Sequence, residues 1–339
     1  MSETLKKLLA LLSDGAFHSG EHLGKALGIT RSAIWKLIKQ LSAWDLEIES
    51  ITNKGYRIQG GLSLLSSAKI LPYLSESSKP FVELEVWDSL PSTNDYLLKI
   101  ERGKKTKTNI ACFAERQTEG RGRRGRGWVS PFAQNIYLSI LWHFVEDPCA
   151  LSGLSLAVGI SIIETLRKLG ITKPLGIKWP NDIYSDHQKL GGILIELSGE
   201  AHDASSMVIG VGLNVAMSSK IKPELLMEPW TDVQSLMGKS AIVDRNALAG
   251  SLLHGLIETI LQFEAGGFAG FKEKWQTLDL SFGKPVSVLT ATQTLQGIGC
   301  GINEEGHFLL ETEKGELKRF SSGEVSLRLS MPYLPVEIM

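Results

Sequence analysis

The most chemically distinctive stretch of the 339-residue chain is Gln117–Trp128, where four arginines are interspersed with glycines. Each glycine costs roughly 1 kcal/mol in a helix interior, so the stretch predicts a mobile loop instead of a helix. Glycines let backbone N–H groups turn inward, and guanidinium groups offer paired donors to phosphate or carboxylate. The pattern therefore favours a loop that closes over an anionic ligand. Two alternatives stay open: a solvated surface loop, and an RGG-like segment that binds RNA without sequence preference.

Four further motifs carry polar residues that could serve a ligand, although each is weak by itself. Ser92–Asn94 opens a helix, either as an ordinary N-cap or as a set of hydrogen-bonding groups for a small polar ligand. Lys178–Asp182 ends a strand with polar groups, which either form a turn or hold a cation and a ligand amide. Lys189 precedes two glycines that would allow close approach of a ligand. Gly210–Asn214 is a glycine-spaced strand with one polar residue, consistent with a pocket wall or with tight packing.

The first 60 residues form a helical unit that ends in a hairpin. Apolar spacing and caps predict helices over Thr4–Leu12, Ser19–Ala26 and Thr30–Trp44, and two short strands flank Thr52–Gly55. This order is that of a winged helix-turn-helix, whose third helix enters the major groove of DNA. The alternative is a stable three-helix domain with a solvated basic face. The residues expected to face DNA are Arg31, Ser32, Trp35, Lys36, Lys39 and Gln40 on the helix, with Lys54 and Arg57 on the hairpin.

The rest of the chain must build the scaffold for the ligand-binding motifs. We expect a winged helix-turn-helix over 1–61, a linker with a short helix over 62–80, a mixed α/β domain over 81–279 and a small β-barrel over 280–339. Strands are predicted at Ile110–Ala114, Asn135–Trp142, Gly176–Trp179, Gly192–Leu197 and Met207–Leu213. Helices are predicted at Thr93–Glu101, Leu151–Leu169, Arg245–Glu264 and Phe268–Leu278.

Composition limits the class of protein. Hydrophobic residues make up 43% of the chain, enough for a large core, and a net charge of −1 identifies no partner. Cys112, Cys149 and Cys300 are few and widely spaced, which fits neither a disulfide framework nor a paired-cysteine zinc site. The amphipathic start, Met1–Leu12, is not a signal peptide, and no apolar run of about 18 residues occurs. We therefore expect a cytoplasmic protein that does not span a membrane.

Taken in order, the motifs resemble those of biotin protein ligases. The resemblance rests on STN at 92–94, QTxGRGRxGRxW at 117–128, KWPND at 178–182, KLxGIL at 189–194 and GxGxN at 210–214. The segment 323–328 is similar to the end of that family's small C-terminal barrel. With the DNA-binding unit in front, the whole chain resembles the bifunctional form, which is both ligase and biotin-operon repressor. The implied fold is α+β and multidomain: a winged helix-turn-helix, a class II synthetase-like catalytic domain and an SH3-like barrel.

The resemblance implies a two-step reaction. Biotin and MgATP give biotinyl-5′-AMP, and biotin then passes to a lysine of a biotin carboxyl carrier protein, that of acetyl-CoA carboxylase. Implied catalytic residues are Arg121, Arg123 and Lys189, which hold the reacting carboxylate and phosphate. Biotin contacts are implied for these three and for Ser92, Thr93, Asn94, Gln117, Gly122 and Gly191. Nucleotide contacts are implied for Lys178, Asn181, Asp182, Asn214 and Trp230, and Asp182 is also expected to hold Mg²⁺.

The resemblance also implies partners: operator DNA, the carrier protein and, when biotinyl-AMP is bound, a second copy of the chain. Two other functions stay open on the sequence. The chain could be a ligand-sensing transcription factor that retains the motifs for binding alone. It could also be a lipoate protein ligase, which shares the reaction class.

Overall fold

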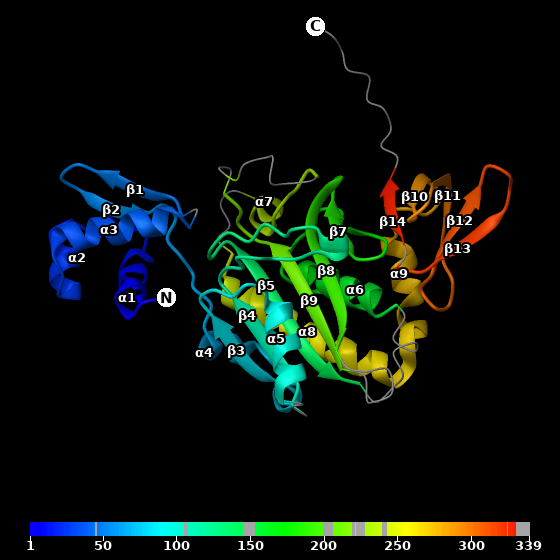
Figure 1. Ribbon diagram of the computed structural model, residues 1–339, viewed down its shortest axis with the longest axis horizontal. Helices are drawn as coiled ribbons and strands as arrows, with labels where there is room; N and C mark the ends of the chain where they lie inside the picture. Colours follow the sequence, from blue (N-terminus) through cyan, green and yellow to red (C-terminus); the bar gives the residue numbers. More distant parts are fainter. Residues whose placement is uncertain are drawn as a thin grey trace, which may run out of the picture.

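In the computed structural model, residues 1–44, 46–104, 108–144, 153–198, 206–218, 221, 228–238, 243–323 and 325–329 are described. They form three parts side by side (Figure 1): an N-terminal helical head, a central part built on a seven-stranded sheet, and a C-terminal part built on a five-stranded sheet. None of the helices in these residues is long and apolar enough to cross a membrane. Cys112 is buried and forms no disulfide, and Cys149 lies outside the described residues.

The head has the predicted three helices and hairpin. Its elements are α1 (Glu3–Leu12), α2 (Gly20–Leu27), α3 (Arg31–Ser42), β1 (Ile48–Ile51) and β2 (Gly55–Ile58). The Ser19 and Thr30 side chains cap α2 and α3, and Gly28 ends α2 in the left-handed region at φ 66°, where glycine is favoured. The third helix ends at Ser42, two residues before the predicted Trp44. Leucines of α1 pack against Ile34 and Leu41 of α3 in a buried core.

The central sheet has the order β3-β4-β5-β9-β8-β7-β6. Its strands are β3 (Glu83–Trp87), β4 (Ile110–Ala114), β5 (Asn135–His143), β6 (Gly176–Lys178), β7 (Asp182–Ser185), β8 (Gln188–Ser198) and β9 (Ser206–Asn214). All neighbouring pairs are antiparallel except β3 and β4. The sequence did not predict β3 or β7, and it began β8 four residues late.

Helices cover both faces of this sheet. Successive side chains of β4 point to opposite faces of the sheet. Cys112 packs in one hydrophobic cluster with Leu97 of α5 (Thr93–Lys104), whereas Phe113 packs in another cluster with residues of α6 and α8. The α6 helix (Leu154–Lys168) and the α8 helix (Arg245–Gly266) lie against each other on that second face (Figure 1). The N-terminus of α5 lies at the middle of β5, at Ser139, beside Gln117 of the loop that carries the arginines.

Smaller helices depart from the predictions. The predicted helix over 268–278 is split into a 3₁₀ turn, η6 (Gly267–Phe271), and α9 (Lys272–Leu278). The short α7 (Val233–Met237) was not predicted. The predicted start of α6 at 151 lies outside the described residues, and the described helix starts at Leu154.

The segment predicted as a linker is partly built into the central core. Its short helix α4 (Ser67–Ile70) is followed by a 3₁₀ turn, η1 (Leu71–Tyr73), and both contact α8. Ile70 is fully buried, and Gly250 of α8 gives it room, because a Cβ there would lie 2.6 Å from the Ile70 carbonyl oxygen. The stretch before α4 is fixed by Arg245, which donates to the Ser63 carbonyl at 2.9 Å and to the Glu115 carboxylate at 2.7 Å.

The head rests on the central part through several contacts. The ring of Trp44 lies 5.0 Å from that of Phe132, centroid to centroid, and Phe132 belongs to the hydrophobic cluster of the head. The Ser218 hydroxyl donates to Glu47 at 2.7 Å, and Ser218 lies four residues beyond the end of β9.

The C-terminal part is an antiparallel sheet in the order β13-β12-β11-β10-β14. Its strands are β10 (Pro285–Leu289), β11 (Thr294–Ile302), β12 (Phe308–Thr312), β13 (Leu317–Phe320) and β14 (Ser326–Leu329). Val288, Phe308 and Leu310 are fully buried and continue the core of the central part. The architecture agrees with the predicted small β-domain, although Glu324 of the predicted 323–328 motif lies outside the described residues.

Candidate active site

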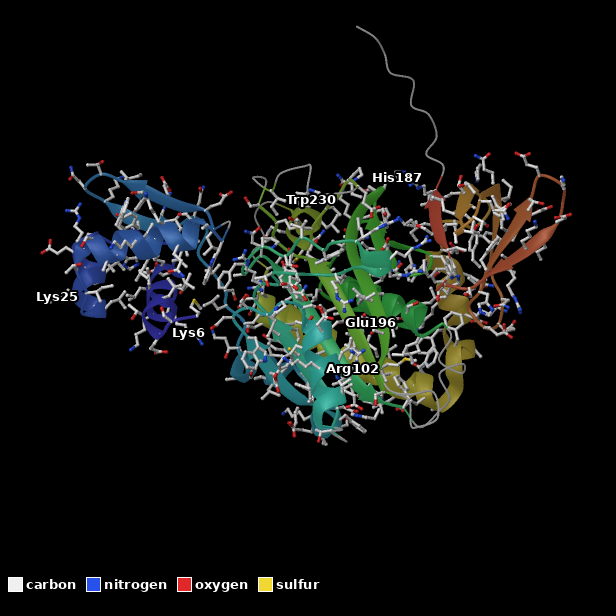
Figure 2. All side chains as sticks on the ribbon, viewed as in Figure 1. Lys6, Lys25, Arg102, His187, Glu196 and Trp230 are labelled. Atoms are coloured by element: carbon white, nitrogen blue, oxygen red, sulfur yellow. The ribbon has the colours of Figure 1, made fainter. Side chains whose placement is uncertain are left out.

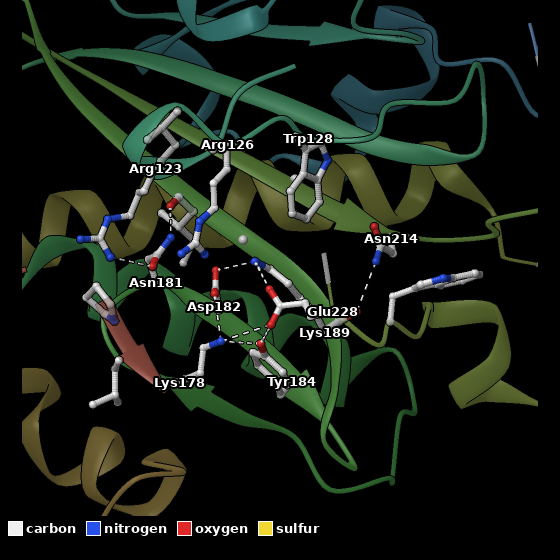
Figure 3. A pocket seen from close by; sticks show the side chains of 18 of the residues that line it. Arg123, Arg126, Trp128, Lys178, Asn181, Asp182, Tyr184, Lys189, Asn214 and Glu228 are labelled. Carbon is white, nitrogen blue, oxygen red and sulfur yellow. Dashed lines mark hydrogen bonds and ion pairs between the residues drawn. The ribbon is translucent and has the colours of Figure 1, made fainter. Parts of the chain in front are cut away.

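A cavity of about 1020 Å³ opens between the arginine loop, the strands β8 and β9, and the C-terminal sheet. Several segments that are far apart in the chain meet in its wall, among them Ser92–Asn94, Arg121–Arg124, Gly210–Gly212 and Val325–Leu329. Of the fourteen residues predicted to bind biotin or nucleotide, Gly191 alone does not line it. The motifs that are far apart in sequence therefore share one space (Figure 3).

One end of the cavity is neutral and polar. The Gln117 amide oxygen accepts from the Thr93 backbone N–H at 2.9 Å and from the Thr93 hydroxyl at 3.1 Å, so it caps α5. The Ser139 hydroxyl, on β5, lies 2.6 Å from both the Thr93 hydroxyl and the Asn94 amide oxygen. Asn94 also donates to Glu196 at 2.8 Å. This closely bonded end presents fixed donors and acceptors, the chemistry that a ureido ring or a similar amide requires.

Glycines of β8 and β9 make room for these side chains. A Cβ at Gly210 would lie 2.2 Å from the Asn94 amide oxygen, and one at Gly212 would lie 2.6 Å from the Trp128 ring. The two glycines after Lys189 differ in what surrounds them. A Cβ at Gly192 would lie 3.3 Å from the Trp128 ring and 3.4 Å from the Asp182 carboxylate, whereas a Cβ at Gly191 would point into β9, 2.9 Å from the Gly212 carbonyl oxygen. Gly192, and not Gly191, therefore lines the cavity, and a ligand contact at Gly191 stays a prediction.

The other end of the cavity is ionic. Lys189 Nζ lies 3.0 Å from Asp182 and 3.1 Å from Glu228, and Lys178 Nζ lies 3.5 Å and 3.3 Å from the same two carboxylates. The Tyr184 hydroxyl donates to Glu228 as well. Figure 3 shows the five side chains converging on one point below Arg126. Two lysines and two carboxylates thus form one network of zero net charge.

The pKa values in this network follow from its pairing. Burial disfavours the charged form of Lys189, but the Asp182 and Glu228 carboxylates outweigh it and raise the pKa of that lysine. Burial also opposes ionisation of Glu228, yet Lys189, the Tyr184 hydroxyl and Lys178 together lower its pKa to about 2. Both groups are charged at neutral pH.

The arginines of the loop point in different directions. Arg121 pairs with Asp95 on α5 and, at 3.0 Å, with Glu196 on β8. Arg123 donates to Asn181 at 3.1 Å and to the carbonyl oxygens of Ser322 and Val325, which join the loop to the C-terminal sheet. Burial lowers the pKa of Arg123, partly offset by the Asp182 carboxylate. Within the loop a 3₁₀ turn, η3 (Arg123–Gly125), closes the bend, with Arg124 at φ 57°.

Asn214 and Trp230 lie together at the edge of the ionic end. The Asn214 amide donates to the backbone carbonyls of Lys189, at 3.3 Å, and Thr231, at 3.1 Å. The backbone of Lys189 pairs with the segment on either side of Trp230, because its N–H donates to the Pro229 carbonyl at 2.8 Å and its carbonyl accepts from the Thr231 N–H at 3.0 Å. Asn214 thus holds the Trp230 segment (Figure 2) against the strand that carries Lys189.

The residues in the cavity or its wall that sequence reasoning did not select include Trp128, Arg126, Ser139, Tyr184 and Glu228. The Trp128 ring stacks over Gly212 and faces Lys189, whose Nζ lies 5.6 Å from the ring centroid. Its indole N–H is buried without a hydrogen-bond partner among the described residues, so it is a donor available to a ligand. Trp128 and Arg126 belong to the loop motif and could have been selected. Ser139, Tyr184 and Glu228 carry no local signal.

The predicted DNA-facing residues lie on the outer side of the head. Arg31, Ser32, Lys36, Lys39 and Lys54 are exposed. Trp35 is 48% exposed, and Lys39 Nζ lies 3.9 Å from its ring centroid.

Arg57 differs from the other predicted DNA contacts. It pairs with Glu49 across the hairpin at 2.6 Å, and its guanidinium lies over the ring of Phe17. Its charge is therefore largely neutralised by its neighbour.

Three family models match the three parts of the chain. An HTH domain matches residues 4–57, the biotin/lipoate A/B protein ligase family matches 86–214, and the biotin protein ligase C-terminal domain matches 281–328. The chain is similar over its length to the bifunctional ligase/repressor BirA of Escherichia coli, with 41% identity over 322 residues, 95% of this chain and 96% of that one. The Bacillus subtilis protein of the same name is 29% identical over 334 residues, 96% of this chain and 100% of that one.

Solved structures agree with this result. The biotin protein ligase from Aquifex aeolicus in complex with biotin and ATP superimposes with a TM-score of 0.62 at 30% identity, covering 73% of this chain and 99% of that one. A central ligase fold with a cationic cavity defines a protein ligase of the biotin/lipoate class. The chain belongs to the biotin protein ligase family, in the form that carries an N-terminal helix-turn-helix domain.

Proposed function

We propose that this chain is a bifunctional ligase and repressor. It makes biotinyl-5′-AMP from biotin and ATP and transfers biotin to a lysine of a biotin carboxyl carrier protein, that of acetyl-CoA carboxylase. The observation that carries the proposal is the single cavity that joins a neutral polar end, around Asn94 and Gln117, to an ionic end around Lys178 and Lys189. These two chemistries suit a ureido ring and a phosphate, respectively, with the reacting carboxylate between them.

In the first step a biotin carboxylate oxygen attacks the α-phosphorus of ATP. The bond from that phosphorus to the β-phosphate oxygen breaks, and pyrophosphate leaves. Two anions meet in this step, so fixed positive charge supplies the main catalytic effect. We assign this role to Lys189 and Lys178, with Arg123 from the loop, and we assign Asn181 to the placement of Arg123 and of the nucleotide.

Arg121 and Gly122 complete the proposed biotin site. Arg121 lines the cavity, and its Nε and Nη2 atoms donate to Asp95 and Glu196, so a ligand carboxylate would share the guanidinium with these partners. Gly122 offers close backbone approach beside it. Ser92, Thr93, Asn94 and Gln117 would bind the ring, and Trp128 would donate its buried N–H.

The second step is acyl transfer. The neutral amine of the carrier lysine attacks the acyl carbon, the bond to the phosphate oxygen breaks, AMP leaves, and the new amide nitrogen loses a proton. AMP is a good leaving group, so positioning and exclusion of water matter more than a protein nucleophile. The arginine loop covers the cavity and would shield the mixed anhydride.

Magnesium would enter with ATP. The described residues contain no group of three ligating side chains, but Mg²⁺ commonly binds one or two carboxylates and otherwise substrate phosphates and water. Asp182 meets that requirement, because it is a carboxylate in the cavity wall beside Lys178 and Lys189. The ion would neutralise phosphate charge, and Asn214 would keep the Trp230 segment beside the nucleotide.

The repressor half of the proposal rests on the head. Its exposed basic helix face fits phosphate and base contacts in a major groove. We infer that biotinyl-AMP drives homodimerisation, so that two heads reach two half-sites of an operator. A cytoplasmic location, and the domain limits 1–61, 62–80, 81–279 and 280–339, stay predictions.

The direct test is incubation of the protein with biotin, ATP and a purified biotin carboxyl carrier domain, read by mass spectrometry. We expect one biotin on one lysine of the carrier. Adenylate binding without carrier labelling would instead favour a ligand-sensing transcription factor. A competition between biotin and lipoate tests the third function, and preference for lipoate would overturn the substrate assignment.

A further inference from the structure

Glu228 occupies an unusual position for a carboxylate in a site proposed to bind phosphate. It contacts both lysines of the ionic end, Lys189 at 3.1 Å and Lys178 at 3.3 Å, and it accepts a hydrogen bond from Tyr184. Together with Asp182 it cancels the charge of the two lysines. The two lysines therefore attract a phosphate fully only after one of the carboxylates moves away or is neutralised.

The structure distinguishes the two carboxylates. Asp182 is the first residue of β7 and sits in register with Lys178 and Gly192 of the adjoining strands, so the sheet fixes it. The Asp182 side chain is 12% exposed. Glu228 belongs to no helix or strand, and its side chain is 29% exposed. The Glu228 side chain has one more rotatable bond than that of Asp182 and is more exposed, so it can turn its carboxylate from the lysines toward solvent, whereas Asp182 is short and held in the cavity wall.

We propose that Glu228 is an internal competitor of the nucleotide. Its carboxylate and the nucleotide phosphate would bind Lys178 and Lys189 alternately, each displacing the other. The inference rests on the proposed function for the identity of the phosphate, which is that of ATP, biotinyl-AMP and AMP. Tyr184 supports the competing state, since its hydroxyl donates to Glu228.

Such a competitor lowers affinity for every phosphate ligand of the site. A weaker hold on AMP helps the site to empty after transfer. The same exchange lets Glu228 return to the two lysines when the phosphate leaves, so that neither buried ammonium group loses its partners. Glu228 is thus a positioning residue for the lysines and acts without touching the reacting atoms.

The test compares wild type with Glu228→Gln, which keeps the shape and removes the charge. The probe is AMP, titrated calorimetrically at low salt with EDTA present so that no metal takes part. We expect the Kd for AMP to fall about tenfold, the effect of removing one charge-assisted competitor. Tyr184→Phe should give a smaller decrease in the same direction. In steady-state assays the KM for ATP should fall in Glu228→Gln, and kcat should fall if AMP release is limiting.

Glu164→Gln is the matched control, because Glu164 pairs with Lys274 at 2.6 Å on the surface, away from the cavity. Its AMP affinity should equal that of wild type. An unchanged or weaker AMP affinity in Glu228→Gln refutes competition. If Glu228→Gln weakens ATP binding only when Mg²⁺ is present, Glu228 is a metal ligand and not a competitor. If the variant loses thermal stability without gaining AMP affinity, Glu228 is a structural residue.

Failure of the proposed function would be recognised from the wild-type protein alone. In that case wild-type protein would neither label the carrier nor bind AMP, and no comparison of the variants could be made. Carrier labelling by wild type, combined with equal AMP affinity in the two proteins, rejects the role of Glu228 alone.

Discussion

Replacement of Gly210 by alanine tests the neutral end of the cavity. Gly210 lies on β9 directly beneath the Asn94 side chain, and a Cβ there would lie 2.2 Å from the Asn94 amide oxygen and 2.9 Å from its carbon. Neither distance is tolerable, and the neighbouring atoms are a hydrogen-bonded amide rather than a flexible chain end. We expect Asn94 to leave its place while the sheet stays intact.

The size of the effect follows from the bonds that Asn94 makes. Its amide oxygen accepts from Ser139 at 2.6 Å, and its nitrogen donates to the Leu194 carbonyl at 3.2 Å and to Glu196 at 2.8 Å. Each such bond is worth about 0.5–1.5 kcal/mol, so loss of two or three, with the orientation of Asn94, amounts to roughly 1–4 kcal/mol. Because the variant must restore this arrangement of Asn94 in order to bind biotin, that range corresponds to a biotin affinity about five- to several-hundredfold weaker.

The assay is calorimetric titration of Gly210→Ala with biotin and, separately, with AMP. AMP affinity should change little, because Asn94 bonds to Leu194 of β8, whereas Asp182 of the ionic end pairs with Gly192. Gly103→Ala is the control, since Gly103 lies in α5, the helix that begins beside Asn94, and has no atom within 4 Å of its added Cβ. It should bind both ligands as wild type does.

Unchanged biotin affinity in Gly210→Ala would refute the reasoning, because it would mean that Asn94 does not orient the ligand. Equal losses for biotin and AMP would point to a general distortion of β9 instead. A lower thermal midpoint alone decides nothing, so the ratio of the two affinities is the quantity to report.

Further predictions concern the buried ion pair, the loop, the head and the core thiol. The Arg245 and Glu115 side chains are only 5% and 4% exposed, so Arg245→Met leaves the Glu115 carboxylate buried without its ionic partner. We expect the free energy of unfolding, from urea titrations, to fall by about 3–5 kcal/mol, and a decrease below about 1 kcal/mol would contradict the pairing. Arg123→Ala should release biotinyl-AMP early and raise labelling of unrelated lysines, and unchanged retention in rapid filtration would oppose that role. Lys36→Ala should weaken operator binding in gel shifts and reduce its salt dependence, by about one unit of slope if Lys36 contacts a phosphate. Cys112 should resist alkylation in the folded protein at pH 8 and react after unfolding, because burial raises the pKa of its thiol far above the usual range, and equal labelling in both states would show that the thiol is accessible.

The sequence was sufficient to predict those features that depend on interactions between residues close together in the chain. Caps at Ser19 and Thr30 and the left-handed stop at Gly28 were predicted, because a side chain bonding the backbone three residues away needs no tertiary context. Strand and helix periodicity gave most of the central elements. The motif order then placed the ligand-binding residues, and thirteen of the fourteen line one cavity, with Gly191 the exception.

Pairing across the chain could not be predicted in this way. Glu228 meets Lys178 and Lys189 only because its segment folds back along β8, 39 residues beyond Lys189. The partners of Arg121 and Arg123, and the neutralisation of Arg57 by Glu49, depend equally on where other elements lie.

Sequence by itself determined which residues are chemically capable and the order of helices, strands and caps, because these follow from side-chain type and short-range spacing. Tertiary structure alone decided which of those residues face the cavity, which are held by neighbouring charges, and that the predicted linker is partly a core segment packed on α8. The physical reason is range: capping and periodicity act over a few residues. Burial and ion pairing are set by contacts between residues that the chain separates by dozens of positions.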